Sequence, residues 1–284
     1  MRRTIGRTGI EVFPIGLGAM PLSLQGRPSE ESAIAVIRAA LDAGVTLIDT
    51  ANSYCVDERD TGHNERLIAK ALDQLGAAGQ VTVATKGGLI RPRGAWNVDA
   101  RPESLIAACE QSLRDLAVET ITLYQLHAPD DRVPFAESVG ALATLRQAGK
   151  IRHAGLSNVD VVQIREALRI VRVESVQNRC NITDQTDLRS GLVELCAAEG
   201  MAYLPYSPVG GHYGHRSLAR HKALQPIAKG HGCSPEQVML AWLLAKGRHV
   251  LPIPGASRIA SITGSADAAK LQLTAEDILR IDAI

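Results

Sequence analysis

The feature that most constrains the fold is a regular alternation of strand-like and helix-like segments along the whole chain. Short apolar segments recur about every thirty residues, and each is followed by a segment whose apolar residues have helical spacing. The predicted strands are 13–20, 46–49, 81–86, 121–126, 151–156, 175–177, 202–206 and 250–254. Eight strands that alternate with helices are typical of a parallel (β/α)8 barrel, an α/β fold known as the TIM barrel.

Local signals predict where several helices begin and end. Ser29 is the expected N-cap of the first helix, and Gly44 stands where a C-terminal cap is preferred. Ser234-Pro235-Glu236-Gln237 predicts a capping box with proline at the first helical position. The other expected helices include 65–75, one opening at Pro102, 134–147, 161–170 and 188–199, and two helices are expected after the seventh strand. Residues 4–12 predict a short N-terminal β-hairpin that turns at Thr8-Gly9.

No linker or shift in composition divides the 284 residues, so residues 1–284 are expected to form a single barrel domain. The alternative architecture is a doubly wound open sheet, which normally carries a glycine-rich phosphate loop after its first strand. The candidate here, Gly16-Leu17-Gly18-Ala19-Met20-Pro21, has proline in place of the third glycine and no helix directly behind it. This departure favours the barrel.

Charge and hydropathy exclude several classes of function. The formal net charge is +1 without a basic run, which argues against nucleic-acid and membrane-surface binding. No apolar stretch approaches the roughly 20 residues that cross a bilayer, and the N-terminus lacks the apolar region of a secretory signal. The five cysteines show no paired spacing, which suits a reducing compartment, so a cytoplasmic location is expected.

Four chemically active side chains follow the ends of neighbouring predicted strands. Asp49 ends the second strand with Tyr54 shortly after it, Lys86 ends the third, and His127 follows the fourth. Each alone has an ordinary structural explanation, such as capping, solvation or packing. Because the carboxyl ends of all barrel strands meet at one rim, the four are expected to converge there, where barrel active sites lie.

This group suits the protonation of a carbonyl oxygen. A phenol with a pKa of about 10 is a weak acid at neutral pH, and the Lys86 ammonium is expected to lower the pKa of Tyr54. Asp49 would hold the lysine, and His127 would donate a hydrogen bond to the carbonyl oxygen. The hydride for the carbonyl carbon must come from a cofactor, since no side chain supplies one.

The sequence resembles the aldo-keto reductase family over essentially its whole length. The matching segments, in the family's order, are Leu47-Ile48-Asp49-Thr50-Ala51 with Ser53-Tyr54, Ala84-Thr85-Lys86, Leu126-His127, Gly155-Leu156-Ser157-Asn158, Val176-Gln177-Asn178, Pro205-Tyr206-Ser207-Pro208 and Pro252-Ile253-Pro254-Gly255-Ala256-Ser257. The resemblance implies an enzyme that reduces an aldehyde or ketone to an alcohol with NADPH, NADH being the alternative. It also implies a catalytic tetrad of Asp49, Tyr54, Lys86 and His127, with Tyr54 as the general acid.

The resemblance also implies a cofactor site. Tyr206 would stack on the nicotinamide, and Ser157, Asn158 and Gln177 would bind its carboxamide. The pyrophosphate would lie under the loop after Ser207, which the glycines make suitable as a flexible cover. The implied cofactor-binding residues are Gly18, Met20, Asp49, Ser157, Asn158, Gln177, Tyr206, Ser207, Pro208, Gly210, Gly211, Ser257 and Arg258.

Several positions depart from the family pattern. Cys55 stands where relatives often have glycine, and Gly264-Ser265 stands where many have a Glu-Asn pair for the adenine. Ser257 and Arg258 are left as candidates to hold a 2′-phosphate, so the choice between NADPH and NADH stays open. His212, His215 and His221 share one loop, but no carboxylate or cysteine completes a ligand set, so no metal site is predicted.

Two other hypotheses stay open. A barrel lyase would use Lys86 to form a Schiff base with a carbonyl substrate. A non-catalytic, nicotinamide-binding subunit would sense redox state while docked on another protein. The expected partner of the reductase is a small carbonyl compound, and protein partners are not indicated. The charged segment 56–63 suits a polar acceptor such as a sugar-like or pyridoxal-like aldehyde, and Trp96 is a candidate for lining the substrate pocket.

Overall fold

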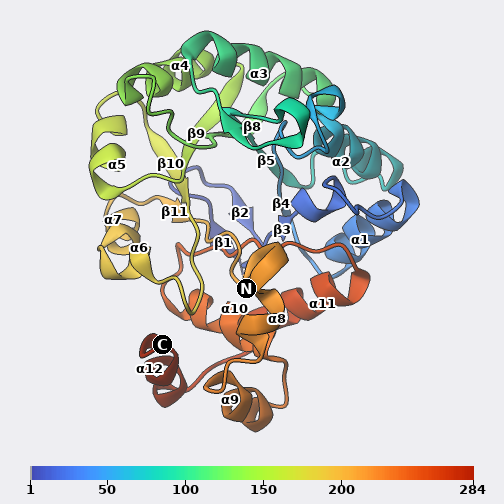
Figure 1. Cartoon of the computed structure of the whole chain (residues 1–284), viewed down its shortest axis with the longest axis vertical. Coiled ribbons are helices and arrows are strands. Elements are labelled where there is room, and N and C mark those ends of the chain that lie inside the picture. The colour runs from blue at the N-terminus through green and yellow to red at the C-terminus, as the bar shows by residue number, and fades with distance from the viewer. Residues whose placement is uncertain (1) are drawn as a thin grey trace.

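The computed structural model describes residues 2–284, apart from the side chains of His212, Tyr213, His215 and Arg216. Its centre is a seven-stranded parallel sheet in which neighbouring strands follow the barrel order predicted from the sequence (Figure 1). The strands are β3 (Leu17–Gly18), β4 (Leu47–Asp49), β5 (Thr82–Gly87), β8 (Ile121–Leu126), β9 (Ile151–Ser157), β10 (Val173–Gln177) and β11 (Ala202–Tyr203).

Residues 250–255 close the sheet into a barrel by joining its two edges. On one side, Tyr203 of β11 bridges Val250 in parallel, and the Leu251 amide donates to the Tyr203 carbonyl at 2.7 Å. On the other side, Gly18 of β3 bridges Gly255, and the amides of Gly16 and Gly18 donate to the carbonyls of residues 252 and 254 at 2.9 Å. With this segment as the eighth strand, the (β/α)8 fold is confirmed.

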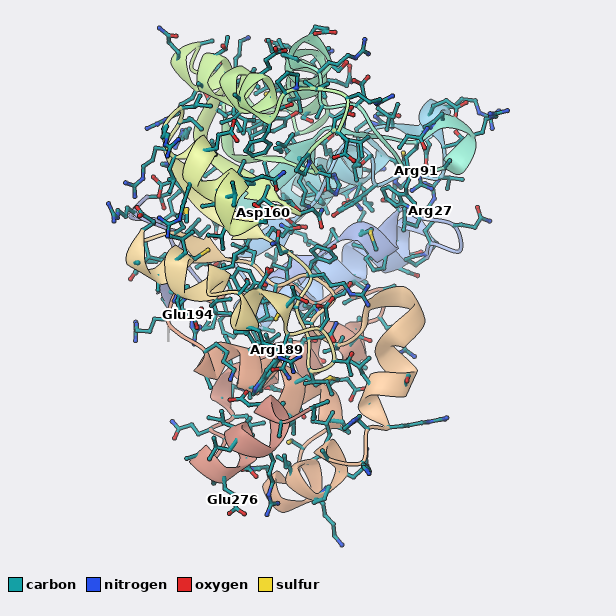
Figure 2. The ribbon with its side chains drawn as sticks, turned by 60° about the vertical axis from the view of Figure 1, so that its left-hand side comes forward. Arg27, Arg91, Asp160, Arg189, Glu194 and Glu276 are labelled. Atoms are coloured by element: carbon teal, nitrogen blue, oxygen red, sulfur yellow. The ribbon has the colours of Figure 1, made fainter. Side chains whose placement is uncertain are left out.

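Helices surround the strands on the outside of the barrel (Figure 1). They are α1 (Glu30–Asp42), α2 (His63–Gln74), α3 (Pro102–Asp115), α4 (Phe135–Gln147), α5 (Val161–Ala167), α6 (Thr186–Arg189), α7 (Leu192–Ala198), α8 (Gly211–Ala219), α9 (Leu224–His231), α10 (Pro235–Ala245), α11 (Ile259–Asp267) and α12 (Ala275–Asp282). The Ser29 side chain accepts from the Ser32 amide, and Ser234 and Gln237 form the predicted capping box. Charged residues such as Glu194 and Glu276 point away from the helices (Figure 2).

Three expectations about local structure are wrong. The predicted strand 13–20 is reduced to Leu17–Gly18, since Pro14 has no amide hydrogen to donate and Met20 already opens a short 3-10 helix, η1 (Met20–Leu22). The predicted helix 188–199 is divided at Gly191, whose φ of +76° is left-handed. The segment after the seventh strand is largely helical from Gly211 onward. It contains three helices, α8, α9 and α10, where two were expected.

An N-terminal hairpin closes the bottom of the barrel, as predicted. Strands β1 (Arg3–Thr4) and β2 (Glu11–Val12) pair in antiparallel fashion, and Ile5 and Val12 are buried against apolar residues from the barrel interior. The Arg3 guanidinium donates hydrogen bonds to the carbonyls of residues 244, 247 and 250. The hairpin therefore closes the end of the barrel opposite the carboxyl ends of the strands.

A second hairpin stands at the carboxyl end of the barrel, directly after β5. Its strands are β6 (Leu89–Ile90) and β7 (Asn97–Val98), joined through the short helix η3 (Pro92–Gly94). Another short helix, η2 (Glu58–Asp60), lies in the segment after β4. Within the described residues, no helix combines the length and apolar character needed to cross a membrane.

Candidate active site

The four side chains predicted to converge do meet at the carboxyl end of the barrel. Asp49 is the last residue of β4, Lys86 lies near the end of β5, and His127 directly follows β8, three strands that are neighbours in the sheet. Tyr54 reaches the group from the loop after β4. All four side chains are buried, with Lys86 fully enclosed.

The Lys86 ammonium organises the group. Its Nζ donates to Asp49 Oδ2 at 2.7 Å, to the Thr50 carbonyl at 2.8 Å and to the Tyr54 hydroxyl oxygen at 3.0 Å. These three acceptors match the three hydrogens of an ammonium group. Because the Tyr54 oxygen accepts from Lys86, the hydrogen of its own hydroxyl is free to be donated elsewhere.

Electrostatics keep Lys86 charged and Tyr54 protonated. Burial lowers the pKa of Lys86, but the Asp49 carboxylate and Tyr54 raise it by more, so the pKa lies above its usual value. Burial raises the pKa of Tyr54, and the lowering effect of Lys86 only partly offsets this. The expectation of a net decrease in the pKa of Tyr54 is therefore wrong, because desolvation of the phenolate outweighs the nearby ammonium.

His127 is positioned as a neutral hydrogen-bond donor. Burial, followed by the positive charge of Lys86, holds its pKa well below the usual value. Its Nδ1 lies 3.5 Å from the Ser53 hydroxyl, and its ring meets the Tyr54 ring edge-on at a centroid distance of 5.6 Å. A neutral imidazole carries one N–H, which can bond to an oxygen placed beside the Tyr54 hydroxyl.

A buried polar network, which the sequence reasoning missed in part, supports Asp49. Gln177 Nε2 donates to Asp49 Oδ1 at 2.7 Å, and Gln125 Nε2 lies 3.5 Å from the same oxygen. The Ser175 hydroxyl donates to Gln125 Oε1 at 3.2 Å. Polar residues such as Gln125 and Ser175 inside otherwise apolar strands were the signal that could have identified them. Gly155 leaves space for the Ser175 side chain, since a Cβ on residue 155 would lie 2.3 Å from Ser175 Oγ.

The residues expected to bind the nicotinamide also lie together. The Tyr206 hydroxyl donates to Asn158 Oδ1 at 2.8 Å, and Asn158 Nδ2 donates to the His127 carbonyl at 2.9 Å and to Ser157 Oγ at 3.2 Å. Asn158 and Ser207 have left-handed φ values of +57° and +49°. Such backbone strain in residues other than glycine is concentrated at functional sites.

The remaining candidates for cofactor binding are spread along the same end of the barrel. Gly18 pairs with Asp49, and a Cβ on Gly18 would lie 2.8 Å from the Ile253 carbonyl oxygen. A Cβ on Gly211 would lie 2.6 Å from Ser207 Oγ. At both glycines, a larger side chain would therefore clash with neighbouring atoms. Met20 is the first residue of η1, and Pro208 follows Ser207. Gly210 is the N-cap of α8. Ser257 and Arg258 are exposed and directly precede α11.

These observations fit a phosphate-bearing cofactor. The amino ends of α8 and α11 present backbone N–H groups, which favour anions. Among the described side chains, no cluster of three metal-ligating residues is found. The side chains of His212 and His215 lie outside the described residues, so the absence of a metal site stays a prediction.

Trp96 and Arg91 stand beside Tyr54 on the β6–β7 hairpin. The Trp96 ring lies edge-on to the Tyr54 ring at 6.5 Å, and the Arg91 Cζ lies 3.8 Å from the centre of the Trp96 ring. Figure 2 places Arg91 on the same side of the molecule as Arg27, which forms an ion pair with Asp60. The hairpin and the segment after Tyr54 thus form one wall of the candidate site.

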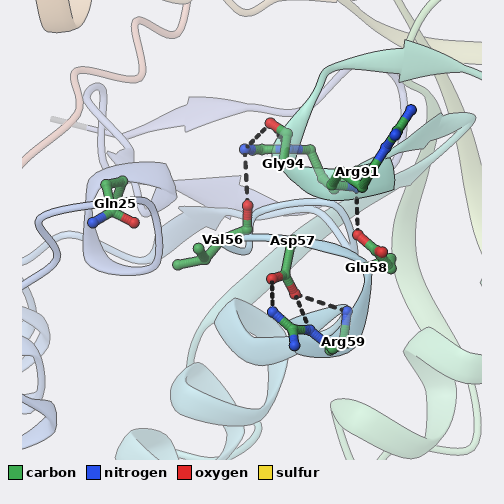
Figure 3. Close-up of a pocket in the computed structure, with 8 residues that line it drawn as sticks. Gln25, Val56, Asp57, Glu58, Arg59, Arg91 and Gly94 are labelled. Atoms are coloured by element: carbon green, nitrogen blue, oxygen red, sulfur yellow. Dashed lines mark hydrogen bonds and ion pairs between the residues drawn. The ribbon is translucent and has the colours of Figure 1, made fainter.

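Two cavities open along this wall. The larger, of about 670 Å³, is lined by Gln25, Val56, Asp57, Glu58, Arg59, Arg91, Arg93 and Gly94 (Figure 3). The smaller, of about 270 Å³, is lined by Asn52, Ser53, Glu58, Thr61, Leu89, Ile90, Arg91 and Pro92. Since Ser53 contacts His127, the smaller cavity borders the candidate catalytic group.

Comparisons with known proteins agree with this geometry. Residues 14–284 match the model of the aldo/keto reductase family. The chain is 33% identical to probable aldo-keto reductase 1 of Glycine max, over 98% of this chain and 86% of that protein. It is 32% identical to an uncharacterized oxidoreductase of Schizosaccharomyces pombe, over 94% of this chain and 85% of that protein.

Solved structures of similar fold carry the same family name. A thermostable aldo-keto reductase crystallised with the inhibitor epalrestat has a TM-score of 0.85 and 30% identity, over 100% of this chain and 99% of that one. An aldo/keto reductase from Klebsiella pneumoniae in complex with NADP and acetate has a TM-score of 0.83 and 26% identity, over 99% and 94%.

Proposed function

The chain belongs to the aldo/keto reductase family of oxidoreductases, and we propose that it reduces an aldehyde or ketone to an alcohol with NADPH, using Tyr54 as the proton donor. The observation that carries this proposal is the contact between Lys86 Nζ and the Tyr54 hydroxyl oxygen at 3.0 Å. The contact leaves the Tyr54 hydrogen available to the substrate and places a positive charge where the phenolate forms.

Each member of the tetrad has a distinct role in this proposal. Tyr54 donates its proton to the carbonyl oxygen, and His127 donates a hydrogen bond to the same oxygen as negative charge develops there. Lys86 stabilises the phenolate that Tyr54 becomes. Asp49 holds Lys86 in its charged form, and Gln177 and Gln125 fix the second oxygen of Asp49.

NADPH supplies the hydride when bound. Tyr206, Ser157, Asn158 and Gln177 would hold the nicotinamide, with Gly18, Met20 and Asp49 beside them. Ser207, Pro208, Gly210 and Gly211 would face the pyrophosphate, and Ser257 and Arg258 the 2′-phosphate. Two related structures from Klebsiella pneumoniae contain NADP or NADPH, which supports this choice, with NADH as the alternative.

The arrangement disfavours the two other hypotheses. Schiff-base formation needs a neutral amine, whereas Lys86 has a raised pKa and donates three hydrogen bonds as an ammonium. A redox-sensing subunit would have no need for an assembled tetrad beside a cavity. We also propose that residues 1–284 act as one domain, since residues 16–18 and 250–255 must pair to close the barrel.

Titration with NADPH and with NADH, followed by quenching of protein fluorescence, tests the cofactor. Saturation with either one, together with turnover of a simple aldehyde such as 4-nitrobenzaldehyde, is the expected result. Absence of binding near millimolar concentrations would refute the proposed reductase activity. A preference for NADPH that is lost in Arg258→Gln would assign the 2′-phosphate to Arg258.

A further inference from the structure

Arg91 is a buried cation whose hydrogen-bond partners are backbone carbonyls. It is 8% exposed, and its Nε and Nη2 donate to the Gly94 carbonyl at 3.2 and 2.8 Å, while Nη2 also donates to the Val56 carbonyl at 3.2 Å (Figure 3). Within the part of the chain that the structure describes, the enclosed Nη1 has no acceptor. A buried charge is costly unless an opposite charge or a full set of hydrogen bonds accompanies it.

The carboxylates along the same wall are engaged with other groups. Asp57 forms an ion pair with Arg59 at 2.7 Å (Figure 3), and Glu58 accepts from the backbone amide of Arg93 at 2.5 Å. Among the described residues, Arg91 forms no ion pair within 4.0 Å, and the lining of the larger cavity holds more arginines than carboxylates. The lining of the larger cavity, with three arginines and two carboxylates, therefore has a formal charge of +1.

Arg91 lies close to the reacting groups. The Trp96 ring contacts both its guanidinium and the Tyr54 ring, and Arg91 lines the smaller cavity together with Ser53, which contacts His127. Trp96 is 46% exposed, and Arg91 itself lines both cavities. A molecule whose carbonyl reaches Tyr54 can thus place a second group against Arg91.

We propose that Arg91 binds an oxoanion, either carboxylate or phosphate, carried by the carbonyl substrate, so that the enzyme prefers anionic aldehydes to neutral ones. This inference rests on the proposed reductase function. The planar guanidinium suits carboxylate and phosphate oxygens, and its bonds to Gly94 and Val56 fix its orientation before the substrate arrives. Arg91 is accordingly a residue that determines specificity, while the proton transfer belongs to Tyr54.

Paired substrates test the preference. With NADPH, kcat/KM is measured for 4-oxobutanoate and its neutral amide, and for glyceraldehyde 3-phosphate and glyceraldehyde. The charged member of at least one pair is expected to react about tenfold to hundredfold better, as a charge-assisted hydrogen bond allows. The pair that shows the difference distinguishes carboxylate from phosphate. Equal rates within both pairs would overturn the proposal.

Variants then assign the preference to one side chain. Arg91→Gln is expected to lower kcat/KM for the charged member about tenfold to hundredfold, mainly through KM, and to change the neutral member less than about threefold. Arg91→Lys, which keeps the charge, should retain part of the preference. Arg93→Gln is the matched control, because it removes an exposed charge from the same cavity wall. A loss that is equal for both members in Arg91→Gln and Arg91→Lys would show a purely structural role.

A binding measurement separates this proposal from the proposed function. The protein has two tryptophans, and Trp242 is fully buried with its Nε1 bonded to Asp282, so Trp96 is the one that a ligand in the cavity can affect. Succinamate and inorganic phosphate are expected to change the fluorescence saturably, and neutral succinamide is not. The change should disappear in Arg91→Gln and in Trp96→Phe. If no aldehyde is reduced, the reductase function fails, and this titration still decides whether Arg91 binds an oxoanion; no saturable change with either anion would refute it.

Discussion

Replacing Asp49 with asparagine keeps the size of the side chain and removes the carboxylate that holds the buried Lys86 ammonium. The two groups are 2.7 Å apart and their side chains are at most 3% exposed. At an effective dielectric constant of about 20, the gross attraction over this distance is about 6 kcal/mol. Since asparagine still offers an oxygen to Lys86, we expect the free energy of unfolding at pH 7 to fall by about 3–5 kcal/mol.

The dependence of this loss on pH gives a sharper test. Asp49 helps to raise the pKa of Lys86 above its value in the unfolded chain, so the stabilisation is present below the unfolded pKa and is lost as pH rises through the folded pKa. In Asp49→Asn, burial lowers the folded pKa instead, and the penalty shrinks as pH approaches about 10.4, where the unfolded lysine also loses its proton. The difference in stability between the two proteins should therefore shrink as pH rises from the folded pKa of Lys86 in Asp49→Asn toward pH 10.5.

Urea unfolding of both proteins at pH 7 and pH 10.5, followed by circular dichroism, measures this difference directly. Other groups that titrate at alkaline pH are common to both proteins, so their effects largely cancel in the comparison. A loss below about 0.5 kcal/mol at pH 7, or a loss that does not change with pH, would refute the view that Asp49 stabilises a buried ammonium.

Three further predictions concern the acid, a buried carboxyl group and the packing inside the barrel. Tyr54→Phe should lower kcat/KM by about 10²–10⁴-fold in NADPH-dependent aldehyde reduction, with NADPH affinity from fluorescence titration changed less than about threefold. Burial raises the pKa of Glu65 to about 7, above its unfolded value of 4.5, so stability should fall by about 3 kcal/mol as pH rises from about 5 to 8, and Glu65→Gln should abolish this slope in urea unfolding. Gly155→Ala should cost about 1–3 kcal/mol in thermal unfolding, because its Cβ would lie 2.3 Å from Ser175 Oγ, whereas Gly140→Ala in α4, where a Cβ meets nothing within 4 Å, should stabilise by about 0.5–1 kcal/mol.

The parts of the fold that the sequence predicted depend on local chemistry or on simple repetition. Ser29 and Ser234 cap helices through hydrogen bonds to residues three positions later, so the signal lies within one turn. The barrel follows from alternating segments, since each strand pairs with the next along the chain. The break at Gly191 was missed because apolar spacing continues on both sides of it, and a single left-handed residue leaves that spacing unchanged.

The sequence was enough to predict which residues form the candidate site. It did not predict the direction of the Tyr54 pKa shift. Position at strand ends was enough to bring Asp49, Lys86 and His127 together. The direction of the Tyr54 pKa shift depends on how completely the barrel and the Trp96 hairpin enclose the phenol, which a one-dimensional pattern does not contain. The stacking of Arg91 on Trp96 brings together residues on either side of the bend at η3, where Arg93 has a left-handed φ of +51°.

The closure of the barrel has a consequence for how the protein is made. Arg3 binds carbonyls more than 240 positions further along the chain, and β3 lacks its second neighbour until residues 250–255 are present. During synthesis, the nascent chain therefore carries an open sheet edge and a hairpin without its final contacts until nearly the whole sequence has left the ribosome. Exposed strand edges are sites of aggregation, so a chain released early, before about residue 255, is the form most in need of chaperone protection.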